Sequence, residues 1–109
     1  MRVFLATVVG CLLATTACAA QARALSQNER QVCGWGSQIA AEAQQAKLSG
    51  VTLYATRKRL QVRKFDKPWM RMTAFGITEQ TYNSRSQLKP GAIKQTYYEQ
   101  CVQHAVAKR

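Results

Sequence analysis

The side chains that could carry out catalysis in this sequence are few and scattered. From Leu25 onward the carboxylates are Glu29, Glu42, Asp66, Glu79 and Glu99. A glycosidase needs two carboxylates that face each other across a cleft, and the spacing here singles out no such pair. Glu29 belongs to a predicted helix cap and Asp66 to a helix entry, while the other three fall on polar helix faces. We therefore expect no catalytic carboxylate pair.

His104 is the single histidine of the chain. A catalytic triad would place a free Cys or Ser beside it, but its neighbour Cys101 is better explained as half of a disulfide. A tetrahedral metal site needs more nitrogen and sulfur ligands than one histidine and two paired cysteines can supply. There is also no Gly-rich phosphate-binding motif. The sequence predicts a non-enzymatic protein without a metal or another cofactor.

A dense run of positive charge is the clearest binding signal. Seven basic residues lie within fifteen positions: Arg57, Lys58, Arg59, Arg63, Lys64, Lys67 and Arg71. Asp66 is the one acid among them, and the rings of Phe65 and Trp69 beside them could seat at an interface. Such a patch attracts anionic lipid headgroups, lipopolysaccharide phosphates or nucleic acid. The simpler alternative is a solvated helix face that supplies solubility.

Aromatic side chains offer a second candidate surface. Tyr97 and Tyr98 are adjacent, so on a helix they point about 100° apart. One of them can pack inward while the other faces solvent or Tyr82. Together with Trp69 they are candidate contacts for a protein partner, although a position at the edge of the core explains them equally well.

The first 24 residues have the pattern of a secretory signal peptide. Arg2 precedes an unbroken apolar run, and small residues then stand at the spacing of a cleavage site after Ala22 or Ala24. Two alternatives remain open. The run over residues 3–20 is just long enough to be an uncleaved membrane anchor, and Cys18 lies in a segment similar to a lipidation motif. We expect a periplasmic or secreted protein.

Removing the leader leaves a single domain, residues 25–109. Of the 16 Lys and Arg residues, Arg2 and Arg23 lie in the leader, so 14 remain against five acids and the charge is +9. Two cysteines also remain, Cys33 and Cys101, and an even number in a secreted chain indicates a disulfide with only one possible pairing. Closing a loop of that length stabilises by about 4 kcal/mol, a large share for so small a domain.

Capping signals predict where the first helix begins and ends. Ser26 and Glu29 have the spacing of a capping box, so a helix should start at Gln27. Gly50 suits the left-handed position that ends it. The apolar stripe of this helix contains small residues that would let another helix approach closely: Gly36, Ala40 and Ala43.

Three further helices are predicted, and no strand pattern competes with them. Thr52 can cap a short helix that we expect to be thinly buried, and Pro68 and Pro90 suit the first position of two more. The helix from Pro68 is apolar on two faces, so we expect it to be the central helix of the core. One of its stripes is Trp69, Met72, Phe75 and Gly76, and the other is Met70, Ala74 and Ile77.

The predicted fold class is therefore all-α: a small bundle of three to four helices cross-linked by one disulfide. The last helix carries one stripe of Ile93, Tyr97, Cys101 and His104. Since the two cysteines lie on the first and last helices, the disulfide should join these two in an antiparallel or oblique arrangement.

The whole of residues 25–109 resembles a diffuse group of small proteobacterial secreted helical proteins with one cysteine in the first helix and one in the last. The features that carry the resemblance are Cys33, Gly50-Val51-Thr52, Tyr82-Asn83-Ser84, Lys89-Pro90 and Cys101. These motifs are generic, and the chain is more basic than is usual in the group. The resemblance implies a compartment and a fold, and it carries no activity.

The sequence thus predicts a small basic binding protein, accessory to an envelope process. That process could be a secretion or conjugation apparatus, an immunity or inhibitor role, or envelope stress, with an envelope protein as the partner. The alternative is a membrane-active protein that binds anionic envelope surfaces through its basic helix and is toxic when overproduced. Nucleic acid is disfavoured as a partner by the predicted location, and the oligomeric state stays open.

Overall fold

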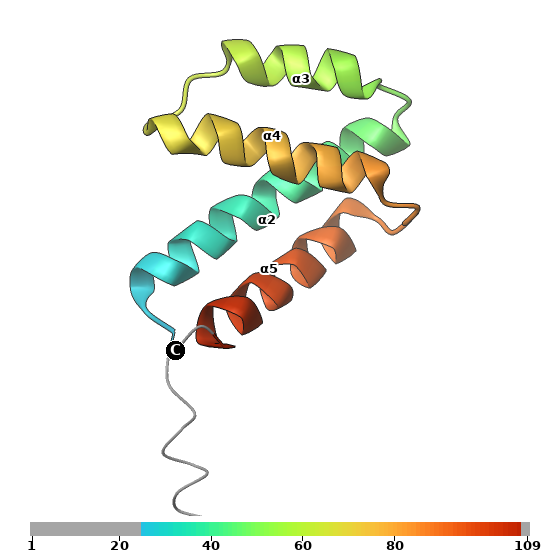
Figure 1. The fold of residues 1–109 in the computed structure, drawn as a ribbon. Coiled ribbons are helices and arrows are strands. Elements are labelled where there is room, and N and C mark those ends of the chain that lie inside the picture. The colour runs from blue at the N-terminus through green and yellow to red at the C-terminus, as the bar shows by residue number, and fades with distance from the viewer. Residues whose placement is uncertain (1–24, 108–109) are drawn as a thin grey trace, which may run out of the picture.

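The computed structural model describes residues 25–107 and, within them, contains four α-helices and no strand. The helices are α2 (Gln27–Leu48), α3 (Leu53–Val62), α4 (Pro68–Asn83) and α5 (Pro90–Ala107) (Figure 1). The all-α fold class is confirmed. The predicted signal peptide, with its alternatives of a membrane anchor and a lipidated Cys18, lies outside the described residues. None of the four helices is long and apolar enough to cross a membrane.

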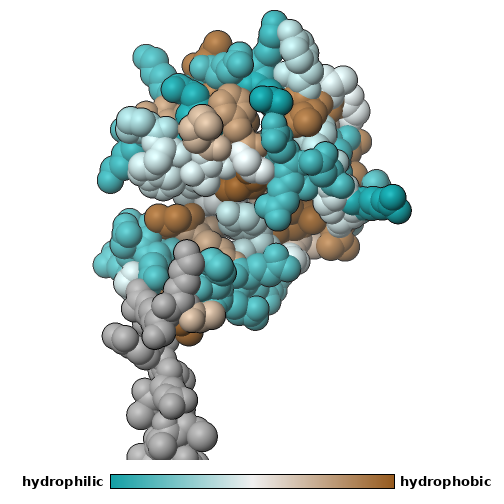
Figure 2. Space-filling view, viewed as in Figure 1, coloured by the Kyte–Doolittle hydropathy of each residue, from teal (hydrophilic) through white to brown (hydrophobic). Residues whose placement is uncertain are grey.

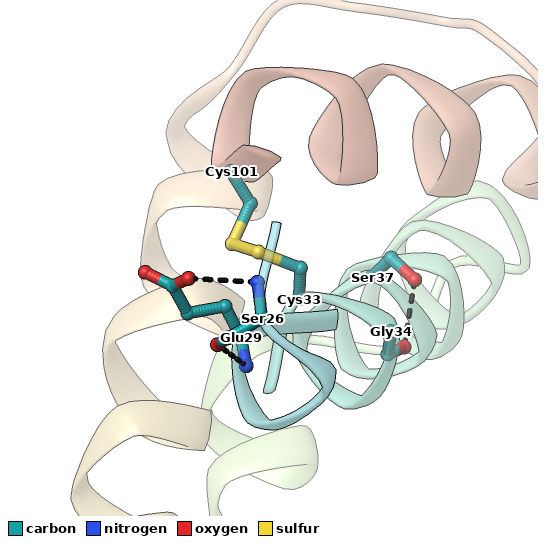
Figure 3. Close-up of a disulfide and its surroundings, with 6 residues drawn as sticks. All are labelled: Ser26, Glu29, Cys33, Gly34, Ser37 and Cys101. Atoms are coloured by element: carbon teal, nitrogen blue, oxygen red, sulfur yellow. Dashed lines mark hydrogen bonds between the residues drawn. A yellow bond between two sulfur atoms is a disulfide. The ribbon is translucent and has the colours of Figure 1, made fainter. Parts of the chain in front are cut away.

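The predicted caps bound α2 at both ends. The Glu29 amide donates to the Ser26 hydroxyl, and the Ser26 amide donates to the Glu29 carboxylate, each over 3.1 Å (Figure 3). At the other end Gly50 has φ +83°, and the amide of Val51 donates to the carbonyl of Ala46 over 2.9 Å. This pattern reverses the chain and satisfies carbonyls that a helix end leaves free.

The central helix is α2, and the expectation that α4 fills this role is wrong. α2 packs against all three other described helices, whereas α5 contacts α2 alone and α4 contacts α2 and α3 (Figure 1). The residues that α2 buries are mostly small: Cys33, Gly36, Ser37, Ile39, Ala40, Ala43 and Gln44. Small side chains let neighbouring backbones approach from two sides, so α2 can be covered by two helices at once.

One apolar stripe of α4 is largely exposed. Trp69 is 44% exposed and Met72 is 72% exposed. The buried face of α4 is instead formed by Ala74, Ile77, Thr78 and Thr81. The sequence of α4 carries two hydrophobic stripes, from which we expected burial on two faces. Only the stripe that faces α2 is mainly buried, so the expectation was too high.

α3 is the outermost helix and is thinly buried, as predicted. It buries only Thr56 and Leu60, and it packs mainly on α4. The Thr56 hydroxyl lies 2.8 Å from the Tyr82 hydroxyl, which also donates to the carbonyl of Val51 over 2.8 Å. These bonds connect the end of α4 to the start of α3.

The predicted close helix approach occurs between α2 and α5 at Gly36. A Cβ atom built on Gly36 would lie 2.8 Å from the ring of Tyr97. Because carbon atoms in contact are about 3.5–4.0 Å apart, the ring occupies the space that any other residue at this position would need.

The Cys33–Cys101 disulfide joins the same two helices, which run antiparallel (Figures 1 and 3). The Cα atoms of Cys33 and Cys101 are 5.6 Å apart, and the predicted pairing of these two cysteines is confirmed. α5 has no fully buried residue in its described length, and it contacts no helix other than α2. α5 is therefore attached through its interface with α2, in which the disulfide, the Tyr97 ring over Gly36 and the packing of Ile93 against the core take part.

The loop between α4 and α5 is held by two polar side chains of α2. The Lys47 ammonium donates to the carbonyls of Thr81, Ser84 and Ser86 over 3.0–3.2 Å. The Gln44 amide donates to the carbonyls of Ser86 and Leu88 over 3.2 and 2.7 Å. Neither residue stood out in the sequence, because its partners are backbone atoms that any sequence supplies.

We predict that Gly36→Ala destabilises the protein by about 1–2 kcal/mol, since the new methyl group must displace Tyr97 and the gain in helix propensity offsets only part of that cost. Gly34→Ala is the matched control, because a Cβ there would meet no other helix or loop of residues 25–107 within 4 Å. It should stabilise by up to about 1 kcal/mol. Urea unfolding followed by circular dichroism measures both, and equal stability of the two variants would contradict the close approach.

Reduction of the disulfide should release α5 before the rest of the domain. The bond closes a loop of 68 residues, so its loss should lower the free energy of unfolding by about 4 kcal/mol. Hydrogen exchange should then accelerate first in α5. Cys101→Ser should act similarly. Cys101 is less buried than Cys33, so the hydroxyl of the introduced serine can reach water. Unchanged protection of α5 in the reduced protein would contradict this assignment.

Lys47→Met should destabilise by about 2 kcal/mol, because it leaves the carbonyls of Thr81 at the end of α4 and of Ser84 and Ser86 in the loop without their charged donor. Lys94→Met is the control, since Lys94 is exposed on α5 and makes no such bonds. Thermal unfolding distinguishes the two, and a Lys47 variant as stable as the control would show that water replaces the ammonium without cost.

Candidate functional site

The structure divides the predicted basic run into groups with different surroundings. Arg57 forms an ion pair of 2.9 Å with Glu79 on α4, and the Lys58 ammonium lies 5.1 Å from the centre of the Tyr54 ring. Arg59 lines a shallow recess on α2. The other four basic residues gather where α3 ends and α4 begins. The seven residues therefore do not form one uniform face.

Of the last four, Arg63 and Arg71 lie over the ring of Phe65, and Lys64 and Lys67 are neighbours of Phe65 and Trp69 in the sequence. We call this group the basic–aromatic cluster: Trp35, Arg63, Lys64, Phe65, Lys67, Trp69 and Arg71. Trp35 belongs to α2. The segment between α3 and α4 supplies Arg63, Lys64, Phe65 and Lys67. The first turn of α4 supplies Trp69 and Arg71.

The ring of Trp35 contacts the other two rings of the cluster edge to face. The ring centres of Trp35 and Phe65 are 6.3 Å apart with an interplanar angle of 86°. Those of Trp35 and Trp69 are 5.6 Å apart with an angle of 80°. Both arrangements are favourable for aromatic pairs and add to the area they bury. Trp35 thus anchors the loop and the start of α4 to the central helix.

Two guanidinium groups lie over the Phe65 ring. The Cζ atoms of Arg63 and Arg71 are 5.4 and 5.6 Å from its centre, within the range of cation–π attraction. Arg71 also donates to the carbonyl of Arg63 over 2.9 Å, and Arg63 donates to the carboxylate of Glu42 over 2.7 Å. These contacts hold both guanidiniums in defined positions before any ligand arrives.

The cluster combines charge with exposed apolar surface. Lys64 and Lys67 are exposed and form no ion pair within the described chain. Trp69 is half-exposed, and Met72 lies one turn further along the same face of α4. The arrangement can therefore present cations and an amphipathic ring to a negatively charged surface.

Two of the three carboxylates that we expected on polar helix faces form ion pairs with arginines of the basic run. Glu42 pairs with Arg63 and Glu79 pairs with Arg57, and all four side chains are more than two-fifths exposed. Glu29 acts in the helix cap, as predicted. In residues 25–107 no group of three His, Cys, Asp or Glu side chains lies close enough to hold a metal ion.

The two adjacent tyrosines lie on different sides of α5. Tyr97 packs over Gly36 and next to the core, and burial raises the pKa of its hydroxyl above 10.0. Tyr98 is half-buried beside a shallow recess that Gly34 also lines. The hydroxyl of Tyr82 forms hydrogen bonds with Thr56 of α3 and with the carbonyl of Val51, and it forms none with Tyr97 or Tyr98 in the described chain. The structure therefore brings neither tyrosine into the basic–aromatic cluster, where Trp69 lies.

Sequence reasoning missed Trp35 as a member of this site. It lies on a different helix, more than twenty residues before the basic run, and only the packing of α2 against α4 brings it to Trp69.

Comparisons of the chain with protein-family models, with curated proteins and with solved structures find no match.

Proposed function

We propose that this chain is a small non-enzymatic binding protein of the bacterial envelope, periplasmic or secreted, and that its basic–aromatic cluster binds an anionic membrane surface. The observation that carries the proposal is the pair of guanidiniums over Phe65 beside the half-exposed ring of Trp69. Tryptophan prefers the boundary between headgroups and acyl chains, and nearby cations attract lipid phosphates. A site of this composition suits that boundary better than bulk water.

The charge balance of the site supports this function. Arg71, Lys64 and Lys67 have no carboxylate partner within the described chain, and Glu42 neutralises Arg63 only in part because both groups remain exposed. Each basic residue close to an anionic bilayer contributes about 1 kcal/mol. The charge of +9 that follows the leader adds a long-range attraction that speeds the encounter.

The aromatic and apolar groups favour a lipid surface over nucleic acid. Trp69 and Met72 on one face of α4 could enter the headgroup layer, whereas a helix that contacts only phosphates gains nothing from exposed apolar side chains. A protein partner in an envelope assembly is the second candidate function. It is favoured by a separate groove of about 710 Å³ between α4 and α5, into which Gln80 of α4 and Thr96, Gln100 and His104 of α5 project polar groups.

Vesicle binding tests the proposal. The protein should bind vesicles that contain phosphatidylglycerol, bind pure phosphatidylcholine vesicles weakly, and lose affinity as salt is raised. Changing Lys64 and Lys67 together to Gln should weaken binding about 30-fold, at about 1 kcal/mol for each charge. Trp69→Ser should weaken binding at every salt concentration, because its contribution is apolar. Co-sedimentation measures all three.

The matched control changes Lys89 and Lys94 to Gln. It removes the same charge from the start of α5, away from the cluster, and both residues are exposed. It should weaken binding several-fold less than the Lys64 and Lys67 pair. Equal effects of the two pairs would show that net charge alone attracts the protein. Equal binding to both kinds of vesicle, or stronger binding to duplex DNA than to phosphatidylglycerol, would overturn the proposal.

A further inference from the structure

The two ion pairs of the described chain have the same composition and different surroundings. Arg63 pairs with Glu42 over 2.7 Å. Arg57 pairs with Glu79 over 2.9 Å. Both carboxylate side chains are 43% exposed, so water reaches the two pairs to a similar extent. Each arginine also lies over an aromatic ring, but among the described residues only the ring under Arg63 carries a second guanidinium.

The Glu42 carboxylate occupies part of the Arg63 guanidinium in the free protein. Nη1 of Arg63 donates to Oε1 of Glu42. A guanidinium binds carboxylates and phosphates through the same N–H donors, so this contact shows that an anionic oxygen group fits at Arg63. Within residues 25–107 it is the one ion pair that the basic–aromatic cluster forms.

The surroundings of Arg63 attract a further negative charge. The Cζ atoms of Arg63 and Arg71 lie 5.4 and 5.6 Å from the centre of the Phe65 ring. Arg71 donates to the carbonyl of Arg63 over 2.9 Å, and because this acceptor is neutral, the charge of Arg71 is left uncompensated. Asp66 is the acid of this segment, and it is exposed and forms no ion pair within the described residues.

We propose that Arg63 binds a phosphate group and that Glu42 occupies this position until the phosphate displaces it. Phosphate oxygens match the paired N–H donors of a guanidinium. The bond from Arg71 to the backbone of residue 63 keeps a second positive charge beside the site. An exposed ion pair is weak, so its loss opposes phosphate binding only slightly, and the released carboxylate returns to water.

Exposed apolar side chains favour a lipid headgroup as the source of the phosphate under the proposed membrane binding, on which this inference rests. Trp69 is 44% exposed and Met72 is 72% exposed on α4. In Figure 2 the upper part of the molecule, which contains α3 and α4, carries hydrophobic residues (brown) among hydrophilic ones (teal). A headgroup phosphate lies next to acyl chains, so the cations and the apolar side chains both find partners there.

Matched variants of the two ion pairs test the displacement. Glu42→Gln and Glu79→Gln each remove one exposed carboxylate and raise the net charge by one, but only the first frees Arg63. The probe is inorganic phosphate, and the arginine side-chain resonances report its binding. Glu42→Gln should bind phosphate about fivefold more tightly than Glu79→Gln, which is the most that the loss of an exposed ion pair gives.

Removal of the guanidinium separates displacement from simple repulsion by Glu42. Arg63→Gln should weaken phosphate binding at least about tenfold, because a charge-assisted hydrogen bond is lost. Arg57→Gln removes the same charge from the other ion pair and should weaken binding only about twofold, since the charge is distant and screened. In the Arg63→Gln background, Glu42→Gln should bind no more tightly than Glu79→Gln. An advantage of Glu42→Gln that persists there would contradict displacement.

All the substituted side chains are exposed, so each variant should unfold at the temperature of the parent, which circular dichroism checks. Vesicles that contain phosphatidylglycerol should bind the single variants in the same order as free phosphate does. The same order with free phosphate, without any vesicle binding, would support displacement by a soluble phosphate and overturn only the proposed function.

Three results would overturn the displacement of Glu42. One is vesicle binding that Glu42→Gln and Glu79→Gln strengthen equally, which would leave the proposed function intact. Another is weaker phosphate binding by Glu42→Gln than by the parent, because Glu42 would then hold Arg63 in its binding position. The third is the absence of phosphate binding in the parent and in every variant.

Discussion

Close packing on the small-residue face of α2 is the constraint on which the rest of this structure depends. Gly36 admits the ring of Tyr97 from α5, and the alanines on the same helix admit α4. Two neighbours can therefore pack on one helix without contacting each other. The groove between α4 and α5 follows directly from this arrangement, since a bulkier α2 would separate one of the two helices from the core.

Only a few of the many basic side chains form ion pairs in the described chain, and several lie over aromatic rings. The two ion pairs of the described chain are exposed, and such pairs contribute at most about 1 kcal/mol each. Four cations also lie over aromatic rings: the ion-paired Arg57 and Arg63, and in addition Lys58 and Arg71. Arg63 and Arg71 share the ring of Phe65. This shared ring places two positive charges side by side in defined positions, and the proposed binding of an anionic surface relies on this arrangement.

The two candidate surfaces depend on different parts of the fold. The basic–aromatic cluster requires the packing of α4 on α2 and the contact of Trp35 with Trp69. The groove requires α5, which the disulfide between Cys33 and Cys101 holds against α2. A reducing environment would therefore open the groove while leaving the cluster in place, so the oxidised state matters for one surface and much less for the other.

The sequence by itself determined the helices and their cross-link, because these depend on local signals. Ser26, Thr52, Pro68 and Pro90 place the four helix starts, and a count of two cysteines allows one pairing. Tertiary structure alone decided which helix is central, since burial depends on how closely backbones approach and not on hydropathy. It also decided the division of the basic run, the role of Trp35 and the capture of loop carbonyls by Lys47, because each depends on partners that are distant in the chain.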